Sequence, residues 1–325
     1  MSFEPTIVQS LKRSKCGDFV YFEDEATMSC SRDWSVHRVL KLFASCKITS
    51  IPVVDDVNTP IAVLTLEDIV RHVAMLASIR FDPRTTDDVM AELRALTVGE
   101  FLDKECGITD RLVIMDAEES LLSATERLAA GIHRICVVSN SELVTMITQT
   151  ALLRFMVQSM HILHLRGFNM TMAEFVPRWV GDRVVVEAAP DVKTIDVINL
   201  MAKTGASGVA IVDTSADPEG VLIAQISRSD LRALLYVPEG VDLLHKDVIT
   251  FYKVANTVES NIKYPRIGVT LDDTLSKAIE KMVATRLHHI YVLDSGFRSP
   301  RSVVCVHDVL SMAVADVETF GVQPE

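Results

Sequence analysis

The chain alternates between stretches whose apolar residues recur every three or four positions and short stretches that are apolar throughout. The first helical stripe consists of Val36, Val39, Leu40 and Phe43. Its spacing predicts one face of an amphipathic helix, with Asp33 as the N-cap. The apolar runs 51–54 and 61–64 lie on either side of a polar turn and predict two buried strands. A second helix is expected over 69–77.

The same order of helix, strand, turn, strand and helix recurs three more times, with a period of about 80 residues. The later strand pairs are predicted at 134–138 and 143–147, 208–213 and 221–226, and 289–294 and 302–304. Strand pairs this short cannot bury both of their faces alone, so the copies are expected to pair with one another. The sequence therefore predicts an α/β fold made of four tandem repeats.

The four repeats are expected to cover 15–78, 96–165, 170–237 and 246–318. Two polar linkers, 78–107 and 236–265, separate the first repeat from the second and the third from the fourth. The first linker contains a helical stretch near 87–96. A long helix over 150–165 is predicted to lead from the first pair of repeats toward the second.

Each second strand ends in a four-residue segment, called a tetrad below, that opens the following helix. The tetrads are Thr65-Leu66-Glu67-Asp68, Thr148-Gln149-Thr150-Ala151, Ser227-Arg228-Ser229-Asp230 and Cys305-Val306-His307-Asp308. A hydroxyl followed three residues later by a carboxylate is also an ordinary helix start, in which the two side chains cap the helix. Three aspartates in register favour a shared binding function over capping alone.

This pattern resembles the cystathionine-β-synthase (CBS) domain family, whose fingerprint is a strand ending in Val-Val-Asp, a turn, a second strand and a Ser/Thr-x-x-Asp segment. Four copies, with His133-Arg134 and His288-His289 before the strands of the even-numbered repeats, resemble the gamma subunit of AMP-activated protein kinase and its fungal and plant relatives. The resemblance implies two Bateman pairs that form a pseudo-fourfold disc and hold adenine nucleotides in clefts, as an energy sensor does.

The resemblance also implies which side chains contact the nucleotide. They are Thr65, Asp68, His133, Arg134, Ser227, Arg228, Asp230, His288, His289, Cys305 and Asp308. The three tetrad aspartates would accept hydrogen bonds from the ribose hydroxyls, because a carboxylate held at a helix start still offers oxygen atoms to a vicinal diol. The residues at the first tetrad position would lie close to the sugar and phosphate. The arginines and histidines would contact the phosphates.

Four positions depart from the family pattern, and each departure removes or weakens a phosphate donor. Thr49 replaces an Arg, Thr150 replaces a Lys, His289 replaces the second Arg, and Cys305 replaces a Ser. The second repeat also lacks the ribose aspartate, at Ala151. The resemblance therefore implies up to three usable nucleotide pockets, and a shared phosphate-binding centre with fewer or weaker donors than in the family.

Composition excludes some other functions. A formal net charge of −12 argues against a nucleic-acid-binding protein, because neutralising phosphates requires massed Lys and Arg. The six cysteines form no C-x-x-C pair, and the N-terminus lacks the apolar segment of a secretory signal. We expect reduced thiols in a cytoplasmic and/or nuclear protein, and no membrane span.

Catalytic and metal functions find little support in the sequence. It contains no P-loop, G-x-S-x-G, G-x-G-x-x-G or H-E-x-x-H motif. The adjacent residues His288 and His289 enter a strand and would point to opposite faces, so no metal site is predicted there. A redox role for Cys305 and a partner-binding or membrane-binding role for 152–165 remain alternatives to a neutral Ser replacement and to a packed helix.

The sequence thus predicts a non-catalytic regulatory subunit that binds AMP, ADP or ATP and modulates a Ser/Thr protein kinase complex. Its expected partners are the kinase catalytic subunit and a beta-type scaffold subunit, and a homodimer formed through the CBS repeats is compatible with the pattern. The alternative is a CBS scaffold protein that acts through protein contacts with weak or no nucleotide binding. The preferred nucleotide and the direction of regulation cannot be inferred from the sequence.

Overall fold

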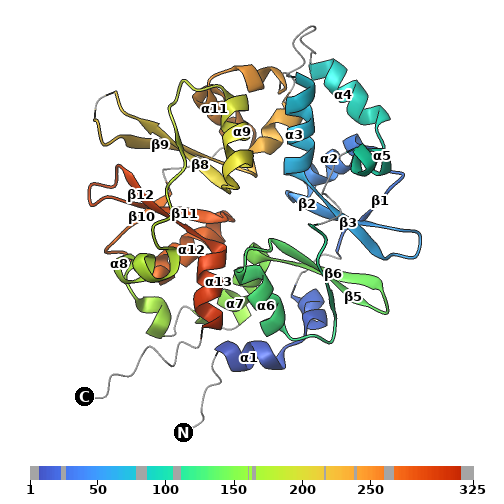
Figure 1. The fold of residues 1–325 in the computed structure, drawn as a ribbon, viewed down its shortest axis with the longest axis horizontal. Helices are drawn as coiled ribbons and strands as arrows, with labels where there is room; N and C mark the ends of the chain where they lie inside the picture. Colours follow the sequence, from blue (N-terminus) through green and yellow to red (C-terminus); the bar gives the residue numbers. More distant parts are fainter. Residues whose placement is uncertain are drawn as a thin grey trace. The chain divides into compact units, whose positions relative to one another are not determined.

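In the residues that a computed structural model of the chain describes, there are four sheets of three strands, one in each predicted repeat (Figure 1). The described residues are 7–22, 27–77, 86–104, 111–159, 161–162, 166–215, 217–237, 240–259 and 267–315. In every sheet the first strand runs parallel to the second, and the second pairs antiparallel with the third. The four-repeat α/β architecture predicted from the sequence is confirmed.

Each repeat supplies a short strand, a helix, a strand pair and a closing helix. The first comprises β1 (Cys30–Ser31), α2 (Val36–Ser45), β2 (Ser50–Val54), β3 (Pro60–Thr65) and α3 (Leu66–Ala77). The second comprises β4 (Ile114–Asp116), α6 (Leu121–Ala129), β5 (Arg134–Ser139), β6 (Glu142–Thr148) and α7 (Gln149–Ser159). The third comprises β7 (Glu187–Ala188), α9 (Thr194–Thr204), β8 (Gly208–Asp213), β9 (Val221–Ser227), η6 (Asp230–Arg232) and α10 (Ala233–Tyr236). The fourth comprises β10 (Gly268–Thr270), α12 (Leu275–Thr285), β11 (His289–Leu293), β12 (Pro300–Cys305) and α13 (Val306–Val314).

Shorter helical segments connect the repeats. They are α1 (Ile7–Arg13), η1 (Cys16–Tyr21), α4 (Thr86–Ala95), α5 (Val98–Lys104), η4 (Arg166–Asn169), α8 (Met172–Phe175), the π-helical η5 (Val176–Val180), η7 (Asp242–His245) and α11 (Val248–Glu259). The helix predicted over 150–165 is observed as α7, which ends at Ser159, and residues 160 and 163–165 lie outside the described residues.

The repeats match one another in strand register as well as in element order. Each antiparallel pair has a register shift near the end of its central strand, at Val53/Val54, Val137/Val138, Ile211/Val212 and Val292/Leu293. An extra residue at one place in a ladder bends the strand there. The recurrence of this irregularity indicates that the four units are copies of one structural motif.

Two details of the helix starts differ from the prediction. Ser35, and not Asp33, caps α2, because Ser35 has extended dihedral angles and its side chain accepts a hydrogen bond from the backbone N–H of Arg38 at 3.2 Å. The third tetrad opens a 3-10 turn, η6, and then the short α10, where the prediction gave one closing helix.

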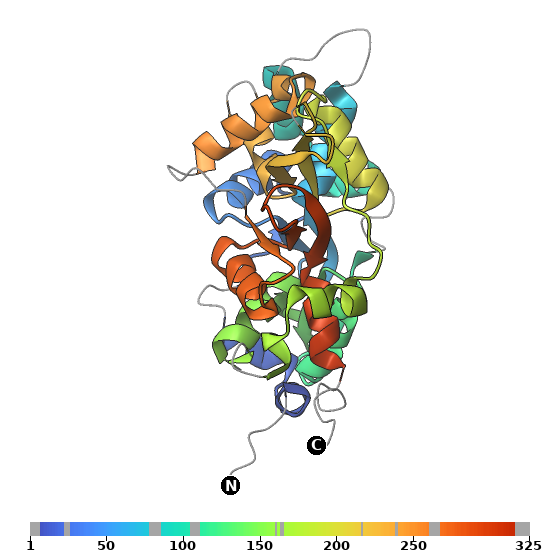
Figure 2. The same cartoon turned by 90° about the vertical axis from the view of Figure 1, so that its left-hand side faces the viewer.

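Contacts gather the chain into two compact units, each made from repeats that are not neighbours in sequence. Unit 1 comprises residues 1–27, 113–184 and 267–325 and contains the second and fourth repeats. Its hydrophobic core combines both repeats, with Leu121 and Ile135 beside Ile279 and Val309. The red helix α13 lies beside the green helix α6 within this unit (Figures 1 and 2).

Unit 2 comprises residues 28–112 and 185–266 and contains the first and third repeats. Phe43 and Ile69 of the first repeat share one core with Ile211 of the third repeat and with Phe251 of α11. Helix α3 contacts η6, which brings the region of the first tetrad close to that of the third. Each pair of repeats therefore completes a core that one repeat cannot form alone.

Burial suppresses the reactivity of several thiols. Among the described residues, Cys16, Cys30, Cys46, Cys136 and Cys305 form no disulfide, and Cys106 lies outside the described residues. Burial raises the pKa of Cys16, Cys30 and Cys136 to about 12, so these three are protonated at neutral pH. In the described part of the chain, no helix has both the length and the apolar character needed to cross a bilayer.

Candidate functional site

The first residue of each tetrad lies opposite the first residue of the preceding strand. The pairs are Ser50 with Thr65, Arg134 with Thr148, Gly208 with Ser227, and His289 with Cys305. In each repeat the second tetrad residue donates its backbone N–H to the carbonyl of the residue before that strand, at 2.9–3.3 Å. This bond holds His133 and His288 next to the tetrads of their own repeats.

Asp68 is buried at the start of α3 and is bonded through both of its oxygens. Its Oδ2 accepts hydrogen bonds from the backbone N–H of Thr65 at 3.0 Å and from Thr65 Oγ1 at 2.6 Å. Its Oδ1 lies 2.6 Å from Nη2 of Arg111 and 3.4 Å from Nη2 of Arg71. The carboxylate therefore caps the helix and also pairs with arginine.

Asp308 is equally buried at the start of α13 and is held by an arginine fork. Nη1 of Arg183 donates to Oδ2 at 2.6 Å, and Nη2 donates to Oδ1 at 2.8 Å. The backbone N–H of Cys305 also donates to Oδ2, at 2.8 Å. Hydrogen bonding to Asp308 raises the pKa of Arg183, so the guanidinium stays charged.

His307 lies against the same guanidinium, with its Nε2 3.0 Å from Nη2 of Arg183. The same nitrogen lies 3.2 Å from Oδ1 of Asp308, so it can accept from Arg183 when the ring is neutral or donate to Asp308. Burial lowers the pKa of His307, which favours the neutral ring. The group Cys305, His307 and Asp308 has ligand atoms within 4.8 Å of one another, a geometry that could hold a metal ion. A metal ion there would have to displace Arg183, which already supplies the positive charge.

Asp230 has the same capping geometry in a more open setting. Its Oδ2 accepts from the backbone N–H of Ser227 at 2.6 Å and from Ser227 Oγ at 2.7 Å. Asp230 is partly exposed, whereas Asp68 and Asp308 are each only 2% exposed. The pKa of Tyr252 in α11 is raised by burial and then by the charge of Asp230, and α11 contacts η6, the element that begins at Asp230.

The second tetrad has no carboxylate, and its polar residues join the second and fourth repeats. The backbone N–H of Ala151 donates to Thr148 Oγ1 at 3.2 Å, so the helix start keeps a cap. Thr150 Oγ1 lies 2.9 Å from Nδ1 of His288, across 138 residues of sequence. His133 Nδ1 lies 3.3 Å from Oε1 of Gln149.

Two predicted phosphate contacts lie in settings that differ from an open cleft. His289 is buried in β11, with its ring edge against Tyr291 at a centroid distance of 5.3 Å. Arg228 of the third tetrad forms an ion pair with Glu67 of the first, at 3.1 Å from Nε to Oε2, and donates from Nη2 to the carbonyl of Gly205. A phosphate would have to compete with Glu67 for Arg228.

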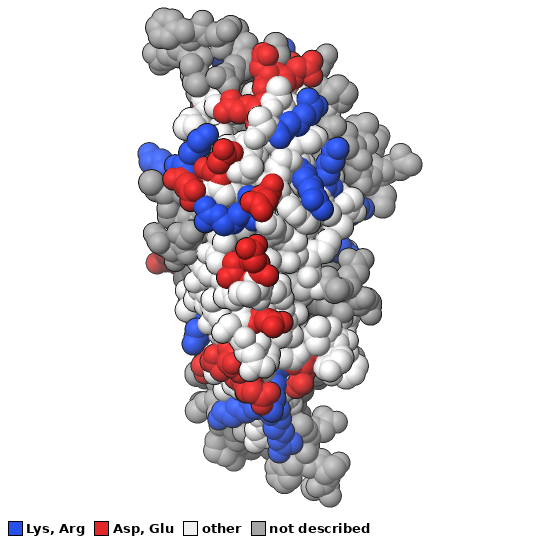
Figure 3. All heavy atoms as spheres, turned by 90° about the vertical axis from the view of Figure 1, so that its right-hand side faces the viewer, with Lys and Arg blue, Asp and Glu red and all other residues white. Residues whose placement is uncertain are grey.

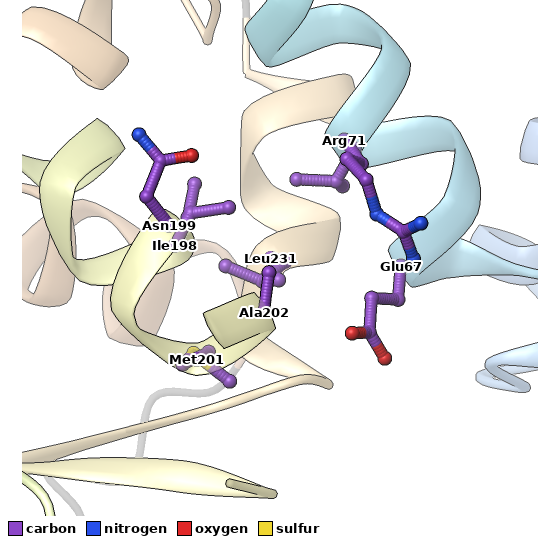
Figure 4. Close-up of a pocket in the computed structure, with 8 residues that line it drawn as sticks. Glu67, Arg71, Ile198, Asn199, Met201, Ala202 and Leu231 are labelled. Carbon is purple, nitrogen blue, oxygen red and sulfur yellow. The ribbon is translucent and has the colours of Figure 1, made fainter. Parts of the chain in front are cut away.

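A cleft in unit 2 separates α3 from α9 (Figure 4). Glu67 and Arg71 stand on the α3 side, Asn199 and Ile198 on the α9 side, and Leu231 lies between the two helices. In the described part of the chain, the tetrad aspartates do not line this cleft. The cleft instead borders two tetrads, through Glu67 of the first and through Leu231, which follows Asp230 of the third.

Sequence reasoning missed three residues of the tetrad surroundings: Arg111, Arg183 and His307. The two arginines lie just before the first strands of the second and third repeats, far in sequence from the aspartates that they contact. Each directly precedes an apolar run, as in Arg111-Leu112-Val113 and Arg183-Val184-Val185. That pattern was visible, but only the fold shows which carboxylates the arginines meet.

Charged side chains of both signs are found on one face of the molecule (Figure 3). On the face in Figure 3, the described acidic and basic side chains are interspersed, without a broad basic area. The net charge of the whole chain is −12. A nucleic-acid-binding surface would require basic residues gathered on one face.

Two of the four repeats match the family model of the CBS domain, and the whole arrangement has the fold of known four-repeat structures. The family model of the CBS domain matches residues 24–75 and 262–314, which correspond to the first and fourth repeats. Among known structures, Protein MJ1225 from Methanocaldococcus jannaschii, described as a proposed archaeal homolog of g-AMPK, matches with a TM-score of 0.69 and 17% identity over 89% of this chain and 96% of that chain. An uncharacterized conserved protein from Pyrococcus horikoshii matches with a TM-score of 0.51 and 13% identity over 88% of this chain and 95% of that chain. At these identities the likeness concerns the fold.

Curated relatives of similar sequence carry the name Protein sds23. The protein of Aspergillus clavatus is 30% identical over 203 residues, which cover 59% of this chain and 37% of the relative. The protein of Neosartorya fischeri is 27% identical over 203 residues, which cover 59% of this chain and 36% of the relative. The matched region therefore spans less than two fifths of these relatives' own length.

Proposed function

We propose that this chain is a non-catalytic regulatory protein that binds an adenine nucleotide through its CBS repeats, with Asp230 of the third repeat as the principal ribose acceptor. The observation that carries the proposal is the shared tetrad geometry. In the first, third and fourth repeats, Oδ2 of the aspartate is fixed by a backbone N–H at the strand end. A carboxylate whose Oδ2 is held by the backbone is pre-oriented, so little entropy is lost when ligand hydroxyls bind.

The exposure of its aspartate favours the third repeat as the nucleotide-binding repeat. Asp230 is the only one of the three aspartates that is partly exposed, and Tyr252 lies within the range of its charge. An aromatic ring beside a carboxylate suits a nucleoside, because the ring can contact a base while the carboxylate accepts from the sugar. His133 and His288, held beside their tetrads in unit 1, are proposed as phosphate donors in that unit.

Titration calorimetry with AMP, ADP and ATP tests the binding proposal. The variant Asp230→Ala is expected to raise the Kd for the preferred nucleotide at least tenfold, which corresponds to about 1.4 kcal/mol. Asp213→Ala is the matched control, since Asp213 Oδ1 accepts from the backbone N–H of Ser215 in a turn of the same repeat, away from the tetrad. If calorimetry detects no heat of binding when the folded wild-type chain is titrated with any of the three nucleotides, the proposal is wrong.

We also propose that nucleotide binding modulates a Ser/Thr protein kinase complex through its catalytic subunit and a beta-type subunit. This part is supported by the fold shared with the protein described as a proposed archaeal homolog of g-AMPK. Coupling would arise if the nucleotide bound one arrangement of the assembly more tightly than another. Affinity purification of the tagged chain, with identification of a kinase catalytic subunit and a nucleotide-dependent change in its activity, is the corresponding test.

One observation favours a second candidate, a scaffold that acts through protein contacts alone. Asp68 and Asp308 are already paired with arginines, and Arg228 is paired with Glu67. If every repeat were closed in this way, partner binding would survive without nucleotide. The scaffold function is supported if Asp230→Ala captures the same partners as the wild-type chain and calorimetry detects no nucleotide binding.

A further inference from the structure

In the fourth repeat, Arg183 contacts both carboxylate oxygens of Asp308, the oxygens that a ribose would need. Oδ2 of Asp308 accepts from Arg183 Nη1 and from the backbone N–H of Cys305, and Oδ1 accepts from Arg183 Nη2. The side chain of Asp308 is 2% exposed, while that of Arg183 is 31% exposed. The guanidinium therefore lies between the carboxylate and solvent.

Further contacts fix the position of Arg183. Its Nη1 also lies 3.4 Å from the carbonyl of Val303, and its Nη2 lies 3.0 Å from Nε2 of His307. The partners come from the end of β12 and the start of α13, so one side chain closes over the whole tetrad. A fork held at both of its terminal nitrogens is a specific arrangement and not a chance surface pair.

A ribose and this arginine cannot use Asp308 together. A vicinal diol binds a carboxylate by donating two neutral O–H groups toward its oxygens. Charge-assisted, bidentate N–H···O bonds are roughly twice as strong as neutral ones. The diol would have to displace the guanidinium and leave a partly buried positive charge without its partner. Arg183 therefore stays bound to Asp308 unless another group neutralises the charge of the displaced guanidinium.

The first repeat has a looser version of the same arrangement. Arg111 meets Asp68 through one nitrogen, Nη2 to Oδ1 at 2.6 Å, and its side chain is 49% exposed. Oδ2 of Asp68 is bonded to Thr65. Nη2 of Arg71 also lies 3.4 Å from Oδ1, and both arginine side chains are about half exposed. Exposed arginines contribute less than a buried fork and are more easily exchanged for a ligand.

We infer that Arg183 is a built-in competitor for the ribose site of the fourth repeat. The inference rests on the proposed nucleotide binding and sharpens it. Arg183 closes the fourth repeat to a nucleoside, and Arg111 competes in the same way at Asp68 of the first repeat. Arginines that precede the first strands of other repeats thus limit access to these two tetrads.

The test uses the full chain carrying Asp230→Ala, so that the third repeat does not contribute, and calorimetry with AMP. Adding Arg183→Gln is expected to lower the Kd for AMP at least tenfold relative to Asp230→Ala alone. Adding Asp308→Asn as a third change is expected to abolish that gain. Arg32→Gln is the matched control, because Arg32 contacts both oxygens of Asp103, through Nη2 alone, in a largely exposed pair.

The outcomes separate the inference from the function on which it rests. If the wild-type chain binds AMP but Arg183→Gln leaves the Asp230→Ala chain unchanged, the inference is wrong and the proposed function stands. The same holds if the Asp230→Ala chain already binds AMP in a manner that Asp308→Asn abolishes. If none of these chains binds AMP, both are wrong.

A second variant covers the case in which Arg183→Gln does not fold. Arg183→Lys keeps the positive charge beside Asp308 but lacks the planar fork. It is expected to give an intermediate Kd in the Asp230→Ala chain, with an unfolding transition close to that of the parent. A folded Lys variant whose affinity for AMP equals that of its parent would overturn the inference.

Discussion

Replacing Asp308 by Ala is expected to lower the free energy of unfolding of unit 1 by about 3 kcal/mol. The substitution removes the partner of Arg183 and leaves a guanidinium, about two thirds buried, without its carboxylate. Truncating one member of a buried ion pair costs roughly 3–5 kcal/mol, and the partial exposure of Arg183 places the loss at the lower end. Loss of the bond from the Cys305 N–H adds to the effect. Urea denaturation, followed by a probe in unit 1, measures it.

The surface ion pair between Arg32 and Asp103 provides the matched control. Nη2 of Arg32 lies 2.8 Å and 3.0 Å from the two oxygens of Asp103, but the side chains are 45% and 68% exposed. Asp103→Ala is therefore expected to cost less than about 1 kcal/mol. Equal losses for the two variants would show that the fork on Asp308 is not a buried pair.

The second large effect is expected from Ile69→Ala in α3, at about 2–5 kcal/mol. Ile69 is fully buried in the core that the first and third repeats share. Truncating such a side chain removes its transfer free energy and leaves a cavity, because neighbouring side chains relax only in part. Since the core is common to both repeats, hydrogen exchange should accelerate in β8 of the third repeat as well as in β2 of the first.

Val57→Ala serves as the control for this prediction. Val57 lies in the turn between β2 and β3 and is 68% exposed, so its truncation is expected to change stability by less than about 0.5 kcal/mol. Faster exchange confined to the first repeat in the Ile69 variant would contradict a core shared by repeats one and three. The grouping of non-adjacent repeats in unit 2 would then be wrong.

The repeats themselves could be predicted because their information is local. A helical stripe such as Val36 to Phe43 and an apolar run such as Ile51 to Val54 lie within ten residues each, and both are buried as expected. The capping by tetrad aspartates was also foreseeable, since hydroxyl and carboxylate are three residues apart. The N-cap of α2 was misplaced by two residues because Asp33 and Ser35 are both good caps, and only the start of the helix decides between them.

The surroundings of the tetrads could not be predicted, because they depend on contacts between distant segments. Arg111 meets Asp68 across 43 residues, and Arg183 meets Asp308 across 125. The resemblance to a family supplied the aspartates but not these arginines. An arginine directly before a first-strand apolar run recurs at Arg266-Ile267-Gly268 in the fourth repeat, where Arg266 lies outside the described residues.

Residues that look equivalent in the sequence also differ in their burial and contacts. His288 and His289 are neighbours, yet His288 contacts Thr150 while His289 is buried against Tyr291. Adjacent residues at a strand entry point to opposite sides, and the sequence alone does not say which side is the interior. The same uncertainty applies to Arg228, whose ion pair with Glu67 depends on the packing of the first repeat against the third.

A crystal structure of the full chain grown with saturating AMP tests the central claim most directly. The account predicts AMP with its ribose hydroxyls on the carboxylate of Asp230, and Arg183 still forked on Asp308. A ribose bound to Asp308 with Arg183 displaced, or AMP absent from every tetrad, would contradict it.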